Sequence, residues 1–175
     1  TKCLKVTVPE GKFASLSVPV HRASTIVFDS VAAYQARRSQ MYDGYSYGLY
    51  GTPTSRTLEK AIANIEGADR AIVVSSGFAA ITLVTLALSQ AGKRVLFPDN
   101  VYDTVRPFAD KLLSRYGVRP VYYDPLMGGR IAELLDADVS LVWLESPGSM
   151  TLEVQDMPAI AAACSARGIP TAADN

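Results

Sequence analysis

The sequence has little cysteine and little histidine, and this scarcity excludes several kinds of site. Its 175 residues contain two cysteines and one histidine. Cys3 and Cys164 lack the CxxC spacing of zinc and redox sites, and they do not supply the cysteine framework of a small disulfide-stabilised domain. His21 alone cannot form a multi-histidine metal centre, and we expect a structural role for it. The sequence therefore predicts no metal site and a reducing compartment.

An excess of charge and a long apolar run are missing as well. The 17 basic residues balance 17 acidic ones, so the chain lacks the charge by which proteins bind nucleic acids or anionic membranes irrespective of sequence. The most apolar stretch, 78–88, is far shorter than the roughly 20 residues of a membrane span. The first residues carry no secretory signal core. We therefore expect a cytoplasmic protein whose partners are small molecules or proteins.

Residues 1–55 differ in character from the rest of the chain. They contain no long periodic segment but many tyrosines, glycines and prolines, which gather in 42–54. This composition predicts an extended arm with turns. Such an arm buries its aromatic side chains against the body of its own subunit or against a neighbouring subunit. A tyrosine-rich surface loop without function is the alternative.

From Thr54 onward the pattern is that of a compact domain. Apolar residues recur at helical spacing up to Gly67, which closes a first helix. Strand and helix segments then alternate, which predicts an α/β fold whose mostly parallel sheet is covered by helices on both faces. Because the chain stops directly after a strand, where a crossover should follow, we expect the N-terminal part of a longer protein. The expected strands are 71–74, 94–97, 120–123, 140–144 and 169–173; the expected helices are 101–116, 131–135, 157–167, one with Leu58, Ile62 and Ile65, and one with Ile81, Val84 and Leu88 on one face.

Ligands of open parallel sheets bind beyond the carboxyl ends of the strands. After the first expected strand, Ser75, Ser76, Gly77 and Phe78 open a helix, and backbone N–H groups at such a helix start suit a phosphate. The segment matches neither the GxGxxG of dinucleotide-binding folds nor the phosphate loop of nucleotide triphosphatases. A phosphate site and a simple helix cap both fit this pattern.

Further strand ends carry an aromatic ring and two acids. Tyr102 begins the helix after the second expected strand, where its ring is placed either to stack on a flat cofactor or to pack against the helix start. Glu145 lies in the turn after another strand, where such an acid is solvated, caps the turn or faces a ligand. Asp174 ends the last strand, where a protonated pyridine nitrogen would find its counter-charge. Together, phosphate cradle, ring and acid predict a pyridoxal phosphate pocket.

Several short motifs follow one another along the chain: Tyr47-Gly48 with Gly51-Thr52-Pro53-Thr54, Leu58-Glu59 with Ile65-Glu66-Gly67-Ala68, Ser76-Gly77-Phe78-Ala79-Ala80, Asp99 to Asp103, Glu145-Ser146-Pro147, and Asp174-Asn175. With these motifs the chain resembles the Cys/Met-metabolism family, the transsulfuration group of fold type I pyridoxal-phosphate enzymes. The resemblance covers nearly the whole chain, as the N-terminal part of a protein more than twice as long. It implies that 1–55 is an arm contacting the neighbouring subunit and that 56–175 is the first part of the cofactor-binding large domain, the rest of which, with a C-terminal domain, lies outside this chain.

The resemblance implies a role for each matching residue. Ser76, Gly77 and Phe78 would bind the phosphate of pyridoxal 5'-phosphate, the last two through their backbone N–H groups. Tyr102 would stack on the pyridine ring and take part in catalysis. Asp174 would pair with the ring nitrogen.

Tyr47 would reach the phosphate and substrate region of the neighbouring subunit, as a second catalytic and cofactor-binding residue. This role implies a homo-oligomer, which we expect to be a tetramer built as a dimer of dimers. The usual Tyr-Gly-Arg of the family reads Tyr47-Gly48-Leu49 here, so the arginine that would bind the phosphate across the interface is missing. Either another cation replaces it or the phosphate is held with less charge compensation. Arg56 lies close in sequence, without a geometric reason to choose it.

The resemblance implies that the Schiff-base lysine lies beyond residue 175, in a Ser-x-Thr-Lys-type segment, and none of the chain's lysines has that sequence setting. The arginine for the substrate α-carboxylate is expected there too. We therefore predict that this chain alone is inactive, and a lysine-lacking pseudoenzyme or interaction module is the non-enzyme alternative. The lysines considered are Lys2, Lys5, Lys12, Lys60, Lys93 and Lys111.

Gly148 and Ser149 follow Glu145-Ser146-Pro147 at the place where γ-acting members of the family carry Thr-Asn-Pro. This difference favours the β-lyase branch. It implies a carbon–sulfur lyase of methionine biosynthesis that converts L-cystathionine to homocysteine, pyruvate and ammonia. Cystathionine γ-synthase, γ-lyase, methionine γ-lyase and sulfhydrylase activities remain alternatives, whereas the missing GxGxxG disfavours a nucleotide-binding oxidoreductase.

Overall fold

The computed structural model describes residues 17–174. The chain divides into two compact units, the first ending at Val73 and the second beginning at Val74. The boundary near residue 55 that the sequence predicted stays a prediction. None of the helices within 17–174 is long and apolar enough to cross a membrane. The expectations for Lys2, Cys3, Lys5, Lys12 and Asn175 lie outside the described residues.

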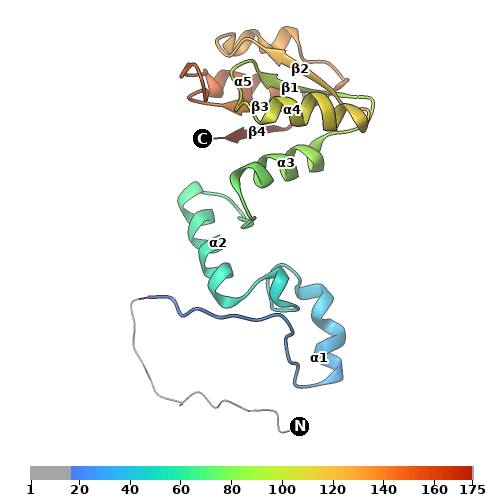
Figure 1. Cartoon of the computed structure of the whole chain (residues 1–175), viewed down its shortest axis with the longest axis vertical. Helices are drawn as coiled ribbons and strands as arrows, with labels where there is room; N and C mark the ends of the chain where they lie inside the picture. Colours follow the sequence, from blue (N-terminus) through green and yellow to red (C-terminus); the bar gives the residue numbers. More distant parts are fainter. Residues whose placement is uncertain (1–16, 175) are drawn as a thin grey trace. The chain divides into compact units, whose positions relative to one another are not determined.

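Short helices precede one long helix in the first unit (Figure 1). The long helix, α2, begins at a capping box in which Thr52 and Ser55 each accept the other's backbone N–H. It ends at Gly67, whose φ of 64° is a left-handed conformation that glycine adopts without strain. The helix expected from the apolar spacing is therefore confirmed. The helical elements of this unit are α1 (Val31–Ala36), η1 (Arg37–Gln40), η2 (Gly48–Tyr50) and α2 (Pro53–Glu66).

The segment before α1, residues 17–30, contains neither helix nor strand. Two hydrogen bonds tie it to the start of α2. The backbone N–H of His21 donates to Oγ1 of Thr54 over 2.8 Å, and this hydroxyl donates to the carbonyl of Pro19 over 2.7 Å. The hydroxyl of Thr54 thus both accepts from and donates to the segment before α1. His21 takes part in this contact through its backbone N–H.

The second unit is built on a four-stranded sheet with the order β2-β1-β3-β4. All of its strand pairs are parallel, so the carboxyl ends of the strands meet at one edge. The central strand β3 has buried residues on both faces, as parallel sheets require. The parallel sheet expected from the sequence is confirmed. The strands are β1 (Arg94–Pro98), β2 (Arg119–Tyr123), β3 (Val139–Glu145) and β4 (Thr171–Asp174).

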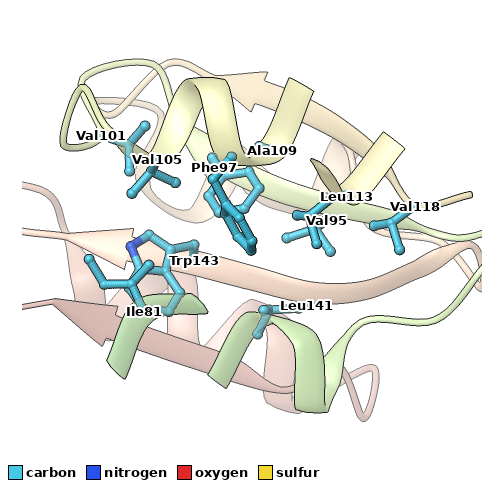
Figure 2. Close-up of a cluster of buried hydrophobic side chains, with 11 residues drawn as sticks. Ile81, Val95, Phe97, Val101, Val105, Ala109, Leu113, Val118, Leu141 and Trp143 are labelled. Atoms are coloured by element: carbon cyan, nitrogen blue, oxygen red, sulfur yellow. The ribbon is translucent and has the colours of Figure 1, made fainter. Parts of the chain in front are cut away.

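Helices cover both faces of this sheet. On one face, α3 and the α4–η3 segment pack against Phe97, Leu141 and Trp143, in the cluster of buried side chains that Figure 2 shows. On the other face, η4 and α5 bury a second cluster around Leu96 and Ile160. These clusters fix the sheet and thereby the edge where the strands end. The covering elements are α3 (Gly77–Leu88), α4 (Val105–Pro107), the π-helix η3 (Phe108–Leu113), the 3-10 helix η4 (Gly128–Glu133) and α5 (Met157–Ser165).

The strand expected at 71–74 is wrong, because these residues have no strand structure. The side chain of Ile72 is 69% exposed. An apolar tetrapeptide becomes a strand only where a partner supplies ladder hydrogen bonds, and no strand within 17–174 pairs with this segment. The other expected strands correspond to β1–β4.

The buried face of α3 differs from the expected one. Ile81 is buried as expected, but Thr85 completes the face, whereas Val84 and Leu88 are exposed. Thr85 is tolerated there because its hydroxyl donates to the carbonyl of Ile81 over 2.7 Å, which satisfies the buried oxygen.

The helix expected at 101–116 begins later, at Val105. Its expected first turn forms a loop instead, in which the backbone N–H of Tyr102 donates to the side chain of Glu145. That of Val101 donates to the carbonyl of Pro98 over 3.0 Å. The short helix expected at 131–135 lies earlier, at Gly128–Glu133, and α5 matches the expected helix at 157–167 except for its last residues.

The core predicts the outcome of one truncation. Leu141 is fully buried in the cluster of Figure 2, so Leu141→Ala should lower the free energy of unfolding by about 2–5 kcal/mol through lost burial and a cavity. Leu126 is 62% exposed, and Leu126→Ala should stay within about 0.5 kcal/mol of the wild type. Urea denaturation of the protein from its complete reading frame measures both. Equal midpoints for the two variants would contradict this core.

Candidate functional site

The carboxyl edge of the parallel sheet is the place where a ligand of such a fold would bind. Glu145 ends β3 and Asp174 ends β4, and the two are register partners in the ladder. Partners in a parallel ladder point to the same face, which here is the face of Trp143 and α3. Ile81 lies beside Trp143 in Figure 2, so the second turn of α3 covers the sheet close to this edge.

α3 starts as an anion-binding helix would. The hydroxyl of Ser76 accepts a hydrogen bond from the backbone N–H of Ala79 over 3.1 Å. The backbone carbonyl of Ser76 accepts one from the backbone N–H of Ala80. The N–H groups of Gly77 and Phe78 have no acceptor within the helix, as at every helix start. A Cβ atom placed on Gly77 would meet nothing within 4 Å. This open approach, with the positive end of the helix dipole, suits a phosphate group.

Tyr102 lies in the loop between β1 and α4, before the helix rather than at its start. The residue is 40% exposed, so it is accessible to a ligand. The backbone N–H of Tyr102 donates to Oε2 of Glu145 over 2.9 Å. The loop that carries the ring is therefore attached to the end of β3.

Glu145 is the acid that the sequence left undecided between solvation, turn capping and a ligand. The structure makes it a buried acceptor, because only 3% of the residue is exposed. Its Oε1 accepts the backbone N–H of Ser149 over 3.0 Å and also the Ser149 hydroxyl. Both carboxylate oxygens are thus occupied by protein donors. The role of this residue was missed because its partner in the β1–α4 loop lies 43 residues away in sequence.

Asp174 is partly buried at the end of β4. Burial raises the pKa of its carboxyl group, and the negative charge of Glu145 raises it further. A carboxylate in such a setting gains most from a cationic partner. A protonated ring nitrogen would be such a partner.

A contact between the loop after β1 and the loop after β3 was not evident from the sequence. Asn100 is buried, with 7% of the residue exposed, and its Nδ2 donates to Oε2 of Glu153 over 2.7 Å. The backbone N–H of Gly148 donates to the carbonyl of Glu153 over 2.9 Å. A Cβ atom on Gly148 would lie 2.0 Å from Nδ2 of Asn100. Glycine at position 148 is therefore imposed by packing.

Tyr47 lies in the first unit, whereas Tyr102 and Asp174 lie in the second. Its ring is half exposed and stands 6.4 Å from that of Tyr50. Leu49, in the place of the expected arginine, is 82% exposed. Gly48 between them has no room for a side chain, because a Cβ atom would lie 1.9 Å from the carbonyl oxygen of Ala23.

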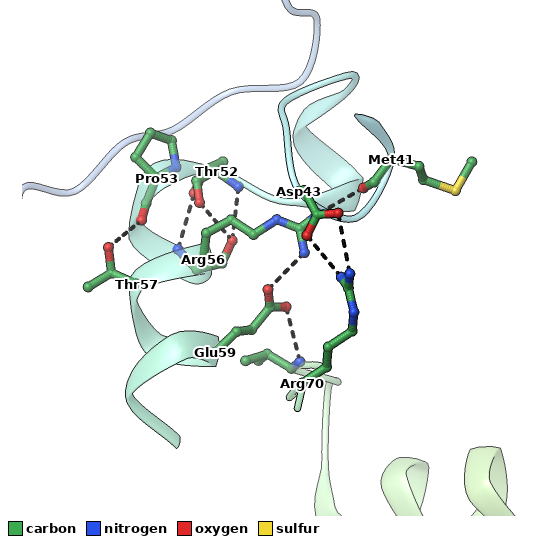
Figure 3. A network of polar contacts seen from close by, with 10 residues as sticks. Met41, Asp43, Thr52, Pro53, Arg56, Thr57, Glu59 and Arg70 are labelled. Carbon is green, nitrogen blue, oxygen red and sulfur yellow. Dashed lines mark hydrogen bonds and ion pairs between the residues drawn. The ribbon is translucent and has the colours of Figure 1, made fainter. Parts of the chain in front are cut away.

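Arg56 is engaged inside the first unit, as Figure 3 shows. Its Nη1 pairs with Oε2 of Glu59 over 3.0 Å, and its Nη2 donates to the carbonyl of Met41 over 2.8 Å. The side chains of this ion pair are largely buried. Arg56 therefore holds the turn before α2 and is not a free cation that could replace an arginine at position 49.

Comparison with known proteins extends the description. The family described as Cys/Met metabolism PLP-dependent enzyme matches the chain over residues 1–175, which confirms the resemblance drawn from the motifs. Cystathionine beta-lyase MetC of Escherichia coli is 39% identical over 145 residues, which are 82% of this chain and 37% of that protein. L-alanine/L-glutamate racemase of Wolbachia pipientis is 35% identical over 171 residues, 92% of this chain and 42% of the relative. The chain thus spans about two fifths of these relatives.

A solved structure supports the fold. The metY protein of Campylobacter jejuni, whose structure contains N'-pyridoxyl-lysine-5'-monophosphate, superposes with a TM-score of 0.84 at 24% identity. The match covers 92% of this chain and 40% of that one. The expected fold type I architecture is confirmed.

The raised pKa of Asp174 has a consequence for stability. A carboxyl group whose pKa is higher in the folded than in the unfolded state destabilises the fold as the pH rises from the unfolded-state pKa through the folded-state pKa. In cofactor-free protein, Asp174→Asn should therefore unfold at a higher temperature than the wild type at pH 7. The difference should vanish below the ordinary aspartate pKa of about 3.9.

Thermal unfolding of apoprotein across this pH range measures the effect. Asp29 is exposed, and Asp29→Asn serves as the control. Its unfolding temperature should equal that of the wild type both at pH 7 and at acidic pH. A lower unfolding temperature for Asp174→Asn at pH 7 would contradict the raised pKa.

Proposed function

Since this chain belongs to the Cys/Met metabolism PLP-dependent enzymes, we propose that the complete protein is a cystathionine beta-lyase. It would convert L-cystathionine and water to homocysteine, pyruvate and ammonia. The observation that carries this choice within the family is Gly148, which packs against Asn100 with no space for a side chain. The threonine that γ-acting members would have there does not fit this loop. Relatives named cystathionine beta-lyase support the same branch.

The residues at the sheet edge fit pyridoxal phosphate. We assign the phosphate to Ser76 and to the backbone N–H groups of Gly77 and Phe78, where the approach is open. The ring of Tyr102, a residue that is 40% exposed, would stack on the pyridine ring. Asp174, whose pKa burial raises, would pair with the ring nitrogen and keep it protonated. When bound, the protonated cofactor withdraws electrons from the α-carbon of the amino acid substrate.

The reaction balances without an oxidant. The α-proton of the substrate is removed, the bond between the β-carbon and sulfur breaks, and the sulfur leaves with homocysteine. The three-carbon remainder takes up water and gives pyruvate and ammonia. Tyr102, stacked on the ring, would influence the proton transfer, and the lysine that moves the α-proton is proposed to lie outside this sequence.

We further propose that the active site forms between subunits of a homotetramer built as a dimer of dimers. Tyr47, Leu49 and Tyr50 present exposed apolar surface in the first unit, which a neighbouring copy would cover. Tyr47 would then complete the site of that copy. The cytoplasmic location expected from the sequence stays part of this proposal.

Product identification tests the reaction. The protein from the complete reading frame, loaded with pyridoxal phosphate, is given L-cystathionine as sole substrate. We expect pyruvate with homocysteine in equal amounts. 2-Oxobutyrate with cysteine would instead assign the protein to the γ-acting members, and failure to bind the cofactor would favour the non-enzyme alternative. L-Alanine in a parallel reaction controls for racemisation, which the Wolbachia relative's name raises.

The stacking role of Tyr102 predicts a difference between two substitutions. Tyr102→Ala removes the ring and should weaken cofactor binding by about tenfold or more, since base or ring stacking on an aromatic side chain contributes about 1–3 kcal/mol. Tyr102→Phe keeps the ring and should bind the cofactor within about threefold of the wild type. Titration of apoprotein with pyridoxal phosphate gives both affinities. Unchanged binding by Tyr102→Ala would remove the stacking assignment.

A further inference from the structure

We propose that Glu145 is a positioning residue, whose carboxylate holds the loop of Tyr102 and the loop of Ser149 at the strand end next to Asp174. This inference rests on the cofactor site of the proposed function. It concerns a residue that would not touch the cofactor itself, because its two oxygens bond to the protein.

The carboxylate joins segments that are far apart along the chain. Oε2 accepts the backbone N–H of Tyr102 over 2.9 Å. Oε1 accepts the backbone N–H of Ser149 over 3.0 Å, together with the hydroxyl of the same residue. Glu145 therefore fixes the distance between the β1–α4 loop and the β3–α5 loop. The hydrogen bond to Glu145 is made by the backbone of Tyr102 itself, so it restrains the residue that carries the ring.

The charge of Glu145 is stabilised by neutral donors. Among the ion pairs of residues 17–174, none includes Glu145, although only 3% of the residue is exposed. Burying a carboxylate without a cation is costly unless several N–H or O–H groups donate to it. The donors of Tyr102 and Ser149 meet this need. These hydrogen bonds stabilise the charge of Glu145 and at the same time fix the two loops.

The ladder sets this carboxylate beside the proposed ring-nitrogen acid. Glu145 and Asp174 are register partners on one face of the sheet. Because the two carboxyl groups end neighbouring paired strands, burial and the negative charge of Glu145 both raise the pKa of Asp174. The strand end that carries the ring-nitrogen acid is thus linked, through one side chain, to the loop that carries the stacking ring.

A neutral amide cannot replace this carboxylate. Glu145→Gln keeps the shape but puts an NH2 group against one of the two sets of donors. It should release either the Tyr102 loop or the Ser149 loop. We expect pyridoxal phosphate to bind about tenfold more weakly to the Glu145→Gln apoprotein, measured by titration without substrate. Glu133 is exposed on η4, and Glu133→Gln is the matched control with unchanged affinity.

A double-mutant cycle separates positioning from a general loss of structure. If Glu145 acts through the ring of Tyr102, Glu145→Gln should change the affinity less than about twofold once Tyr102→Ala has removed that ring. The circular dichroism of the bound cofactor should also change in Glu145→Gln and not in Glu133→Gln. Tenfold losses that multiply in the double variant would overturn the inference.

A gentler variant keeps the test valid if Glu145→Gln does not fold. Ser149→Ala removes the hydroxyl donor to Oε1 and leaves the bond of Tyr102. It should weaken cofactor binding a few-fold, and only where the Tyr102 ring is present. The same loss in the Tyr102→Ala background would count against positioning. Product identity is independent of this cycle, so 2-oxobutyrate from the wild type would refute the β-lyase reaction and leave the role of Glu145 standing.

Discussion

One extra residue in β3 determines which side chains face the candidate site. Arg94 pairs with Val139, but the next residue of β1, Val95, pairs with Leu141, so Ser140 is left over. The hydroxyl of Ser140 donates to the carbonyl of Arg94 over 3.0 Å, which satisfies the interrupted ladder. Because a shift of one residue moves every following side chain to the other face, this irregularity places Trp143 and Glu145 on the face of α3 and the Tyr102 loop.

Buried polar groups then organise the edge of the sheet. Glu145 and Asn100 are both almost fully buried, and each joins the loops after β1 and β3. A carboxylate without hydrogen-bond partners at position 145 would cost several kcal/mol or more. The loops must therefore adopt conformations that bring their N–H groups to Glu145 and the carboxylate of Glu153 to Asn100. Both oxygens of Glu145 and Nδ2 of Asn100 are paired in this way, whereas Oδ1 of Asn100 has no hydrogen-bond partner among residues 17–174. The shape of the site thus follows chiefly from the need to satisfy the carboxylate of Glu145.

The sequence predicted the parallel sheet and most of its elements, because alternating strand and helix patterns are local. It failed where the outcome depended on distant partners. The segment 71–74 has strand composition but no partner within 17–174, and Tyr102 leaves the helical register because Glu145 takes its N–H. Asn100 was missed for the same reason. The family motifs located Ser76, Tyr102 and Asp174 as candidates, whereas their supporting contacts needed coordinates.

The missing arginine at position 49 shifts the burden of cofactor binding in the proposed site. Arg56 is held by Glu59 and the carbonyl of Met41, so within the first unit it does not compensate the phosphate. The start of α3 offers the equivalent of about half a positive charge, which is less than a phosphate dianion requires. In the proposed site, the ring contacts of Tyr102 and Asp174 must then contribute a larger share of the affinity than they would with an arginine at position 49. Because Glu145 links the Tyr102 loop to the strand end beside Asp174, a small displacement of its loops should weaken cofactor binding more than it would if an arginine at position 49 also bound the phosphate.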